Sequence, residues 1–249
     1  MDLVISPLKI ELAGLIKRSA AVKVFSKKKL KIYMLPGKAN KTMIAVTGMG
    51  KDSSINSLKE IKRYIDNMDI AKDEDLRIIS TGFCGSLSDK IKAGDLVYYK
   101  KIINLAEKFD DQKTGHPTGG PVLLSEIKSH SLLNGIISSG LKEVTAATVP
   151  EVVGNSSKKK RLREDLGCDV IDMESYWIAK NIPEVPELIF LRAVSDDTDA
   201  DFPEGRFIAL KIALSIFEIK KKCNFLSLLK KIKKAQGSIT KFLEEVIDL

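Results

Sequence analysis

The chain has 249 residues and a net charge of +8, and 44% of its residues are hydrophobic, which is enough for one core of ordinary size. It has no uncharged apolar stretch of about eighteen residues and no signal-peptide pattern at its start, so we expect neither a membrane-spanning helix nor export. The 3 cysteines are far apart in the sequence. This favours reduced thiols in a cytoplasmic protein over a disulfide framework or a zinc site. Lysine clusters such as Lys158–Arg163 fall on helical patterns where lysine normally faces solvent, and no motif predicts nucleic-acid binding.

Short β-prone runs alternate with helical patterns along the chain. The predicted strands are Leu3–Ile5, Lys31–Leu35, Met43–Val46, Arg77–Thr81, Asp95–Ile103, Val144–Thr148, Asp169–Ile171 and Leu188–Val194. The predicted helices are Lys9–Ser19, Ser53–Asp66, Ser125–Ser138, Ser156–Leu166, Met173–Asn181 and Arg206–Lys222. This alternation predicts an α/β fold, a three-layer sandwich with a central mixed, mostly parallel twisted sheet flanked by helices. Ligands of such sheets bind beyond the carboxyl ends of the strands, so the residues that follow each strand are the candidates for a site.

The C-terminal segment 223–249 has apolar residues at helical spacing and lysines on the opposite face. Gly237 interrupts this pattern and suggests two helices. We therefore expect a main domain over residues 1–222 followed by a C-terminal helix pair. Two interpretations stay open, because the pair could dock on the domain or lie on a membrane surface.

Two glycine-rich stretches follow predicted strands. Thr47–Ser54 lacks the third glycine of a dinucleotide-binding loop and the Ser or Thr of a phosphate loop. In the second stretch, Gly82 and Gly85 would let a ligand approach the backbone closely. A tight turn is the simpler interpretation of both.

The run "SDDTDAD" (195–201) follows the last predicted strand and resembles a calcium loop. Asp197, Asp199 and Asp201 have the required spacing, but Phe202 replaces the glycine and Ile208 replaces the closing glutamate of such a loop. We therefore predict no metal and no cofactor, and we interpret these three residues as part of a polar loop.

The stretch "VIDMES" (170–175) places two carboxylates where a strand ends and a helix begins. For Asp172 the simplest interpretation is stabilisation of the helix N-terminus. Bulky apolar residues follow Glu174, which predicts a partly buried carboxylate. Such a group needs partners, and the hydroxyls of a sugar would serve.

Three stretches, "STGFCGSLSDKIKAGDLV" (80–97), "VIDMES" and "LRAVSD" (191–196), together resemble the nucleoside phosphorylase/nucleosidase superfamily. The nearest branch by these motifs is that of the 5′-methylthioadenosine/S-adenosylhomocysteine nucleosidases, and the resemblance extends to about residue 220. It implies cleavage of the N-glycosidic bond of a purine nucleoside, without a cofactor, by a homo-oligomer.

The resemblance also implies residue roles. Asp196 would protonate N7 of the purine, Ser195 would orient Asp196, and Glu11 would activate water. Glu174 would hold the ribose hydroxyls, with Met173 packed on the sugar. The remaining matched positions lie on substrate-binding segments: Gly82, Phe83, Val152 and Val153.

The chemistry of the reaction agrees with these roles. Cleavage of the bond builds cationic character on the ribose and negative charge on the leaving purine. A general acid must therefore serve the base, and a general base must serve the water on the other face of the sugar. Asp196 directly ends an apolar strand, so we expect it to be better shielded than Asp197, Asp199 or Asp201.

The attacking nucleophile is a separate question. The resemblance implies that phosphorylases have an arginine just before the glycine-rich strand end. This chain has Ser80 at that position, and the absence of the arginine favours water over phosphate as the nucleophile. Phe83 departs from the pattern, since relatives usually have a small serine there. A purine nucleoside phosphorylase and a non-catalytic nucleoside-binding protein remain the alternatives.

The tail suggests a more specific substrate. With "VIDMES" and the "DFP" at 201–203, segment 223–249 resembles the hopanoid-pathway nucleosidases, which remove adenine from a lipid-linked adenosyl group. A basic amphipathic tail would suit peripheral membrane contact in such an enzyme.

Overall fold

The computed structural model describes residues 1–36, 42–68, 76–105, 141–182, 187–201 and 225–247. The strands are β1 (Asp2–Ser6), β2 (Val22–Lys27), β3 (Leu30–Met34), β4 (Thr42–Val46), β5 (Arg77–Ser80), β6 (Phe83–Ser86), β7 (Leu96–Asn104), β8 (Lys142–Thr148), β9 (Val170–Asp172) and β10 (Glu187–Asp196). The helices are the 3-10 turn η1 (Lys9–Leu12), α1 (Ala13–Arg18), α2 (Lys51–Asp66), α5 (Ser156–Leu166), α6 (Ser175–Asn181) and α8 (Phe225–Val246). The predicted helices Ser125–Ser138 and Arg206–Lys222 lie outside the described residues.

The strands form one mixed sheet in the order β2-β3-β4-β1-β5-β10-β6-β9-β8-β7. Its centre is parallel, because β1 pairs with β4 and β5, and β5 pairs with β10. Every residue of β1 and β4 is buried, as expected for parallel strands that are covered on both faces. The predicted α/β fold with a mixed, mostly parallel sheet flanked by helices is confirmed.

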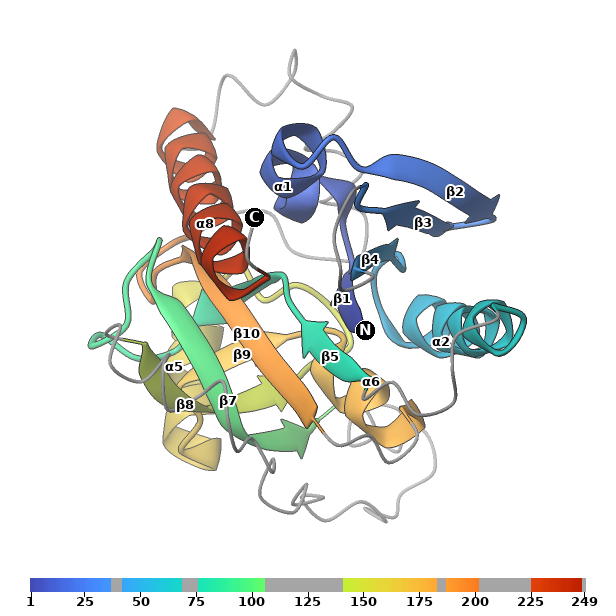
Figure 1. The fold of residues 1–249 in the computed structure, drawn as a ribbon. Helices are drawn as coiled ribbons and strands as arrows, with labels where there is room; N and C mark the ends of the chain where they lie inside the picture. The colour runs from blue at the N-terminus through green and yellow to red at the C-terminus, as the bar shows by residue number, and fades with distance from the viewer. Residues whose placement is uncertain (37–41, 69–75, 106–140, 183–186, 202–224, 248–249) are drawn as a thin grey trace.

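The sheet differs from a plain layered sheet at β10. Residues 187–190 of this long strand pair with β5, whereas residues 191–193 pair with β7 and residues 193–196 pair with β6. The strands β10, β6, β9, β8 and β7 thus close into a ring. Figure 1 shows β10 lying beside β7, the pair that closes it. The pairing of β10 with β6 shifts register between Val194 and Asp196, and such bulges bend strands. Ring closure leaves this half of the sheet without free edges.

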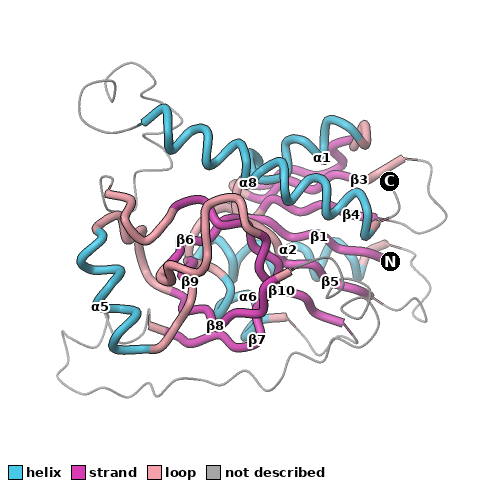
Figure 2. Tube along the Cα trace, turned by 90° about the vertical axis from the view of Figure 1, so that its left-hand side faces the viewer, coloured by secondary structure: helices cyan, strands magenta, loops and turns pink. Residues whose placement is uncertain are grey.

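Helices cover both faces of the sheet. Leu58 and Ile61 of α2 and Trp177 of α6 belong to one apolar cluster, whereas Leu15 of α1 and Phe242 of α8 belong to another on the opposite face. Figure 2 shows α8 and α1 lying together on one side of the strands. A third, smaller cluster lies under α5. The three layers therefore match the prediction.

The prediction of a C-terminal helix pair is wrong, because α8 is one continuous helix through Gly237. Gly237 is exposed, and a side chain added there would meet nothing. A glycine in a helix costs only about 1 kcal/mol. Burial of Ala235, Ile239 and Leu243 in the cluster shared with α1 and the sheet offsets that cost.

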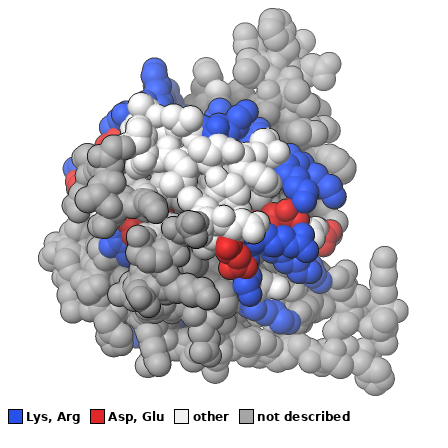
Figure 3. Space-filling view, turned by 45° about the vertical axis from the view of Figure 1, so that its right-hand side comes forward, with Lys and Arg blue, Asp and Glu red and all other residues white. Residues whose placement is uncertain are grey.

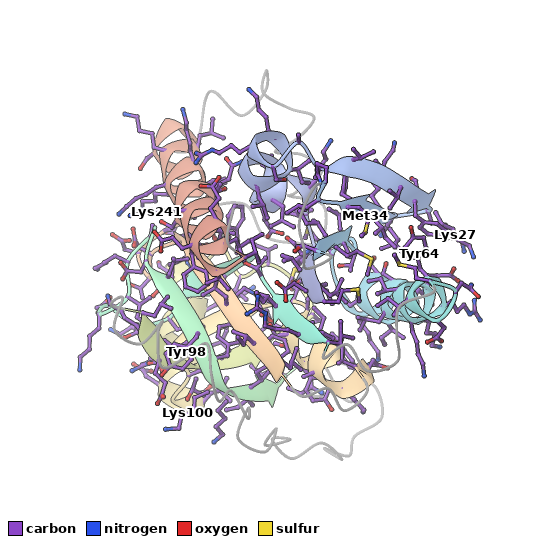
Figure 4. The ribbon with its side chains drawn as sticks, viewed as in Figure 1. Lys27, Met34, Tyr64, Tyr98, Lys100 and Lys241 are labelled. Atoms are coloured by element: carbon purple, nitrogen blue, oxygen red, sulfur yellow. The ribbon has the colours of Figure 1, made fainter. Side chains whose placement is uncertain are left out.

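Two strands were not predicted from the sequence. β2 is mostly exposed and forms the sheet edge, so it lacks a buried apolar run, and β6 is short and contains Gly85. β2 reaches the α2 side through Phe25, whose ring centre lies 5.3 Å from that of Tyr64, and through Lys27, which lies 2.8 Å from Glu60 (Figure 4). On the face shown in Figure 3, Lys and Arg side chains stand in separate groups around an uncharged area.

The helix α8 is amphipathic, and its apolar side faces the domain. Among the helices that the structure describes, none has the length and apolar character needed to cross a membrane. The exposed lysines of α8 include Lys230, Lys233 and Lys241. Lys231 instead forms an ion pair with Asp197, 2.7 Å away.

Candidate functional site

The turn after β1 holds the first predicted site residue, Glu11, which is only 3% exposed. Its carboxylate accepts hydrogen bonds from Ser6 Oγ (2.5 Å), the Leu8 N–H (2.8 Å) and the Phe83 N–H (2.9 Å). Burial raises the pKa of Glu11, and these hydrogen bonds oppose the rise. The structure thus joins the carboxyl end of β1 to the turn between β5 and β6.

Gly82 makes this junction possible. It has a φ of +149°, which lies within the range that favours glycine. A Cβ at this position would lie 3.1 Å from Glu11 Oε1. The ring of the neighbouring Phe83 packs on the apolar cluster beneath α8, while its backbone N–H is the group that reaches Glu11.

Glu174 is the second buried carboxylate, at the end of β9 and the start of α6. Its Oε1 accepts a hydrogen bond from the Gly50 N–H at 2.8 Å. Burial raises the pKa of Glu174 to about 8, and the nearby charges of Asp172 and Glu11 add to the rise. The glycine-rich turn 47–50 therefore belongs to the site, although its sequence predicted only a tight turn.

Asp172 and Arg192 form a buried pair, and Arg192 interacts electrostatically with both Glu11 and Glu174. Arg192 Nε lies 3.4 Å from Asp172 Oδ2, and both side chains are 0% exposed. The guanidinium also donates to Ser80 O (2.6 Å) and Ser175 Oγ (2.7 Å). Asp172 accepts a hydrogen bond from the Ser175 N–H at 3.2 Å, so its predicted place at the helix start is confirmed.

Arg192 was missed by the sequence analysis. It lies in the apolar run "ELIFLRAV" (187–194), and its guanidinium lies 5.5 Å from the Tyr99 ring and 5.9 Å from the Phe190 ring. An arginine in the middle of a run that is otherwise apolar from Leu188 to Val194 was the available signal, because a buried charge requires partners. The positive charge of Arg192 opposes the rise in the pKa of both Glu11 and Glu174.

Asp196 ends β10 and is 6% exposed. Ser195 Oγ lies 2.6 Å from its Oδ1, and the ammonium of Lys159 forms an ion pair with its Oδ2. Gly85 allows this carboxylate close to β6, since a Cβ there would lie 3.1 Å from Oδ2. The sequence predicts the burial of Asp196 but gives no sign of its cation.

The expectation that the lysine cluster Lys158–Arg163 faces solvent is wrong for Lys159. We expected the lysines of Lys158–Arg163 to face solvent, and Lys158 and Lys160 are exposed. Lys159, in contrast, is 0% exposed, and it also donates to Asp197 O at 2.7 Å. Helical periodicity places Lys159 on the inward side of α5, the side from which Leu162 and Leu166 pack against the core.

The other aspartates of the acidic run point to different partners. Asp197 accepts a hydrogen bond from the Ala93 N–H (2.7 Å) and pairs with Lys231. Asp201 accepts one from the Ser156 N–H (2.8 Å), and Asp199 is exposed. Within the described part of the chain, no group of His, Cys, Asp and Glu is arranged to hold a metal ion.

The remaining predicted residues lie at neighbouring strand ends. Met173 and Val153 pack against the same apolar cluster under α5, and Val152 is half-buried beside them. The structure therefore gathers Glu11, Gly82 and Phe83 in one group of direct contacts, and Ser195 and Asp196 in another. Glu174 lies within electrostatic range of Glu11.

Comparison with known proteins gives a consistent result. The family model described as "Phosphorylase superfamily" matches residues 3–203. No curated protein matches the sequence at a significant level.

Several solved structures share the fold. Futalosine hydrolase of Helicobacter pylori strain 26695 has a TM-score of 0.70 at 16% identity, over 99% of this chain and 97% of that chain. The 5′-methylthioadenosine/S-adenosylhomocysteine nucleosidase of Helicobacter pylori, with butyl-thio-DADMe-Immucillin-A, has a TM-score of 0.70 at 17% identity and the same coverage. The corresponding protein of Neisseria meningitidis, in complex with methylthio-immucillin-A, has a TM-score of 0.68 at 18% identity, again over 99% and 97% of the two chains. Since these matches span almost all of both chains, α8 falls within the shared fold.

Proposed function

The chain belongs to the phosphorylase superfamily, and we propose that it hydrolyses the N-glycosidic bond of an adenine nucleoside with a substituent at C5′. The observation that carries this proposal is a set of three buried carboxylates at strand ends: Glu11 after β1, Glu174 after β9, and Asp196 as the last residue of β10. Solved relatives named as nucleosidases and as a hydrolase support it.

Glu11 is proposed to activate the attacking water. Burial raises the pKa of its carboxyl, which makes the carboxylate a stronger base towards water. Its bonds to the N–H groups of Leu8 and Phe83 fix its orientation before substrate arrives. Positioning of this kind is a large part of the catalytic effect of such groups.

Glu174 and Met173 are proposed to hold the ribose. The carboxyl group of Glu174 can bond the 2′- and 3′-hydroxyls in either protonation state. In its ionised form, which becomes populated as the pH rises through about 8, it also stabilises positive charge that develops on the sugar. The Gly50 N–H fixes Glu174 by a hydrogen bond to its Oε1. Val152 and Val153 are proposed to contact the purine.

Asp196 is proposed to act as the acid that protonates N7 of the leaving purine, with Ser195 orienting it. Ser195 Oγ lies 2.6 Å from Asp196 Oδ1, which suits that role. Protonation of a leaving group by a positioned acid typically contributes 10²- to 10⁴-fold to the rate.

Water is favoured over phosphate as the nucleophile. Phosphate would need an unoccupied cation, whereas the guanidinium of Arg192 is already bound to Ser80, Ser175 and Asp172. The carboxylate of Glu11 nearby would repel an anion. A phosphate-dependent phosphorylase is therefore the second candidate, and a non-catalytic nucleoside-binding protein is the third.

The substituent at C5′ is proposed from the relatives, and the lysines of α8 give the lipid-linked candidate a test, although α8 itself lies within the fold that the relatives share. The candidates are methylthioadenosine, adenosylhomocysteine, and a lipid-linked adenosyl group such as adenosylhopane. For the lipid-linked substrate, we expect the exposed lysines Lys230, Lys233 and Lys241 to attract anionic membranes, since the apolar side of α8 is buried. The test is the triple variant Lys230→Glu/Lys233→Glu/Lys241→Glu. If it binds anionic vesicles more weakly than wild type does, the lipid-linked substrate is supported.

The deciding experiment is a screen of these nucleosides, and of futalosine, for release of base. Each reaction is run with and without phosphate and followed by chromatography of the free base and the sugar. We expect base release that does not depend on phosphate, with free sugar as the second product. A sugar 1-phosphate product would establish the phosphorylase, and no release from any nucleoside would favour the non-catalytic alternative.

A further inference from the structure

The ion pair between Lys159 and Asp196 has no explanation in the fold alone. Lys159 comes from α5 and Asp196 from the end of β10, and both lie in the interior. Burying two charges costs more free energy than filling the same space with apolar side chains. An apolar residue at position 159 would bury this side of α5 at lower cost.

We propose that Lys159 is a positioning residue that supplies, through Asp196, the proton that the leaving purine receives. This inference rests on the proposed function, because it assigns the source of the proton that Asp196 passes on. Asp196 touches the substrate in this scheme, and Lys159 does not.

The hydrogen bonds around Asp196 suit proton transfer from Lys159 through Asp196 to the purine. Ser195 Oγ lies 2.6 Å from Asp196 Oδ1 and 3.1 Å from Cys84 O. A hydroxyl has a single hydrogen to donate. When Ser195 donates it to the Cys84 carbonyl, a proton on Asp196 completes the bond between Asp196 and Ser195. The site thus has partners for Asp196 in both protonation states.

The reaction balances as follows. The electron pair of the C1′–N9 bond leaves with the purine, N7 takes a proton from Asp196, and Asp196 takes one from the ammonium of Lys159. Water adds its hydroxide to C1′ and gives its other proton to Glu11. Lys159 then regains a proton from solvent, and Glu11 releases one. An arginine could not serve in this way, because its guanidinium is not deprotonated in proteins.

The test compares two substrates in three proteins: wild type, Lys159→Met and Lys159→Arg. One substrate is the nucleoside that wild type cleaves fastest in the screen. The other is its N7-methylated form, whose purine already carries the positive charge and needs no proton. The readouts are kcat and KM for release of base, with thermal unfolding as a check on folding.

We expect both variants to lose about 100-fold or more in kcat on the unmethylated nucleoside, as for the loss of a general acid. Their kcat on the N7-methylated nucleoside should stay within a few-fold of wild type. Lys159→Arg retains the buried positive charge, so its kinetics can still be measured if Lys159→Met does not fold.

Three results would overturn the inference. Equal losses on both substrates would show a structural role, wild-type kcat in Lys159→Arg would show that a fixed charge suffices, and wild-type kcat in Lys159→Met would show no role. Absence of base release by wild type from every nucleoside would instead refute the proposed function itself.

Discussion

Lys159 and Asp196 form an ion pair whose side chains are 0% and 8% exposed. The two residues are 37 positions apart in the sequence and belong to different elements. Because both charges are removed from water, each depends on the other for its stability in the folded protein.

The first prediction concerns the stability of this pair. Lys159→Met should lower the free energy of unfolding by roughly 3 to 5 kcal/mol, because it leaves a buried carboxylate without its cation. The double variant Lys159→Met/Asp196→Asn should recover much of the loss, since no unpaired charge remains. Urea unfolding of the wild type, both single variants and the double variant measures this coupling. Losses that simply add would contradict it.

The second prediction concerns Glu174 and pH. Its pKa is raised from about 4.5 to about 8, so the folded protein holds a proton there that the unfolded chain releases. The stabilisation is therefore fully present below pH 4.5 and is lost as the pH rises through about 8. Glu174→Gln cannot ionise, so its stability relative to wild type should increase as the pH rises from 4.5 to about 8. The increase should be on the order of a few kcal/mol, as this change in pKa implies. Urea unfolding of both proteins between pH 5 and 9 measures the difference. Parallel pH curves would show that Glu174 ionises normally.

The third prediction concerns the proposed base. Glu11→Gln should lower kcat by about 10²- to 10⁴-fold, because the amide cannot take a proton from water. Its oxygen can still accept the hydrogen bond that the Phe83 N–H donates to Glu11 at 2.9 Å, and Glu11 is not proposed to bind the nucleoside, so KM should change little. The amide nitrogen cannot accept the hydrogen bonds from Ser6 Oγ and the Leu8 N–H, so we also expect some loss of stability. Steady-state kinetics on the nucleoside that wild type cleaves fastest separates the two effects. An unchanged kcat would remove Glu11 from the mechanism.

The fourth prediction concerns Gly237 in α8. Gly237→Ala should stabilise the protein by about 0.5 to 1 kcal/mol, because the site is helical, exposed and open. Gly94→Ala is the matched control. Gly94 has a φ of +92° and lies against the Lys234 side chain, so alanine there should destabilise. Thermal unfolding of the two variants should therefore shift in opposite directions, and a loss of stability in Gly237→Ala would argue that α8 is strained there.

Much of the fold could be predicted from local patterns. The alternation of apolar runs and helical periods gave eight of the strands and the α/β class, since burial on both faces of a strand shows directly in its residues. Edge strand β2 and short β6 could not be predicted, because neither has a buried apolar run. Gly237 misled the prediction of the tail, since packing against the sheet decides whether a helix continues through a glycine.

The site divides in the same way. By itself, the sequence determined which carboxylates follow strands, and it named Glu11, Glu174 and Asp196 as candidates by resemblance. Only the tertiary structure decided their partners: the Phe83 N–H for Glu11, the Gly50 N–H for Glu174, and Lys159 for Asp196. The physical reason is that a charge's environment is set by groups brought close in space. Lys159 has the same local sequence character as Lys158 and Lys160, and only the docking of α5 separates the buried lysine from the exposed ones.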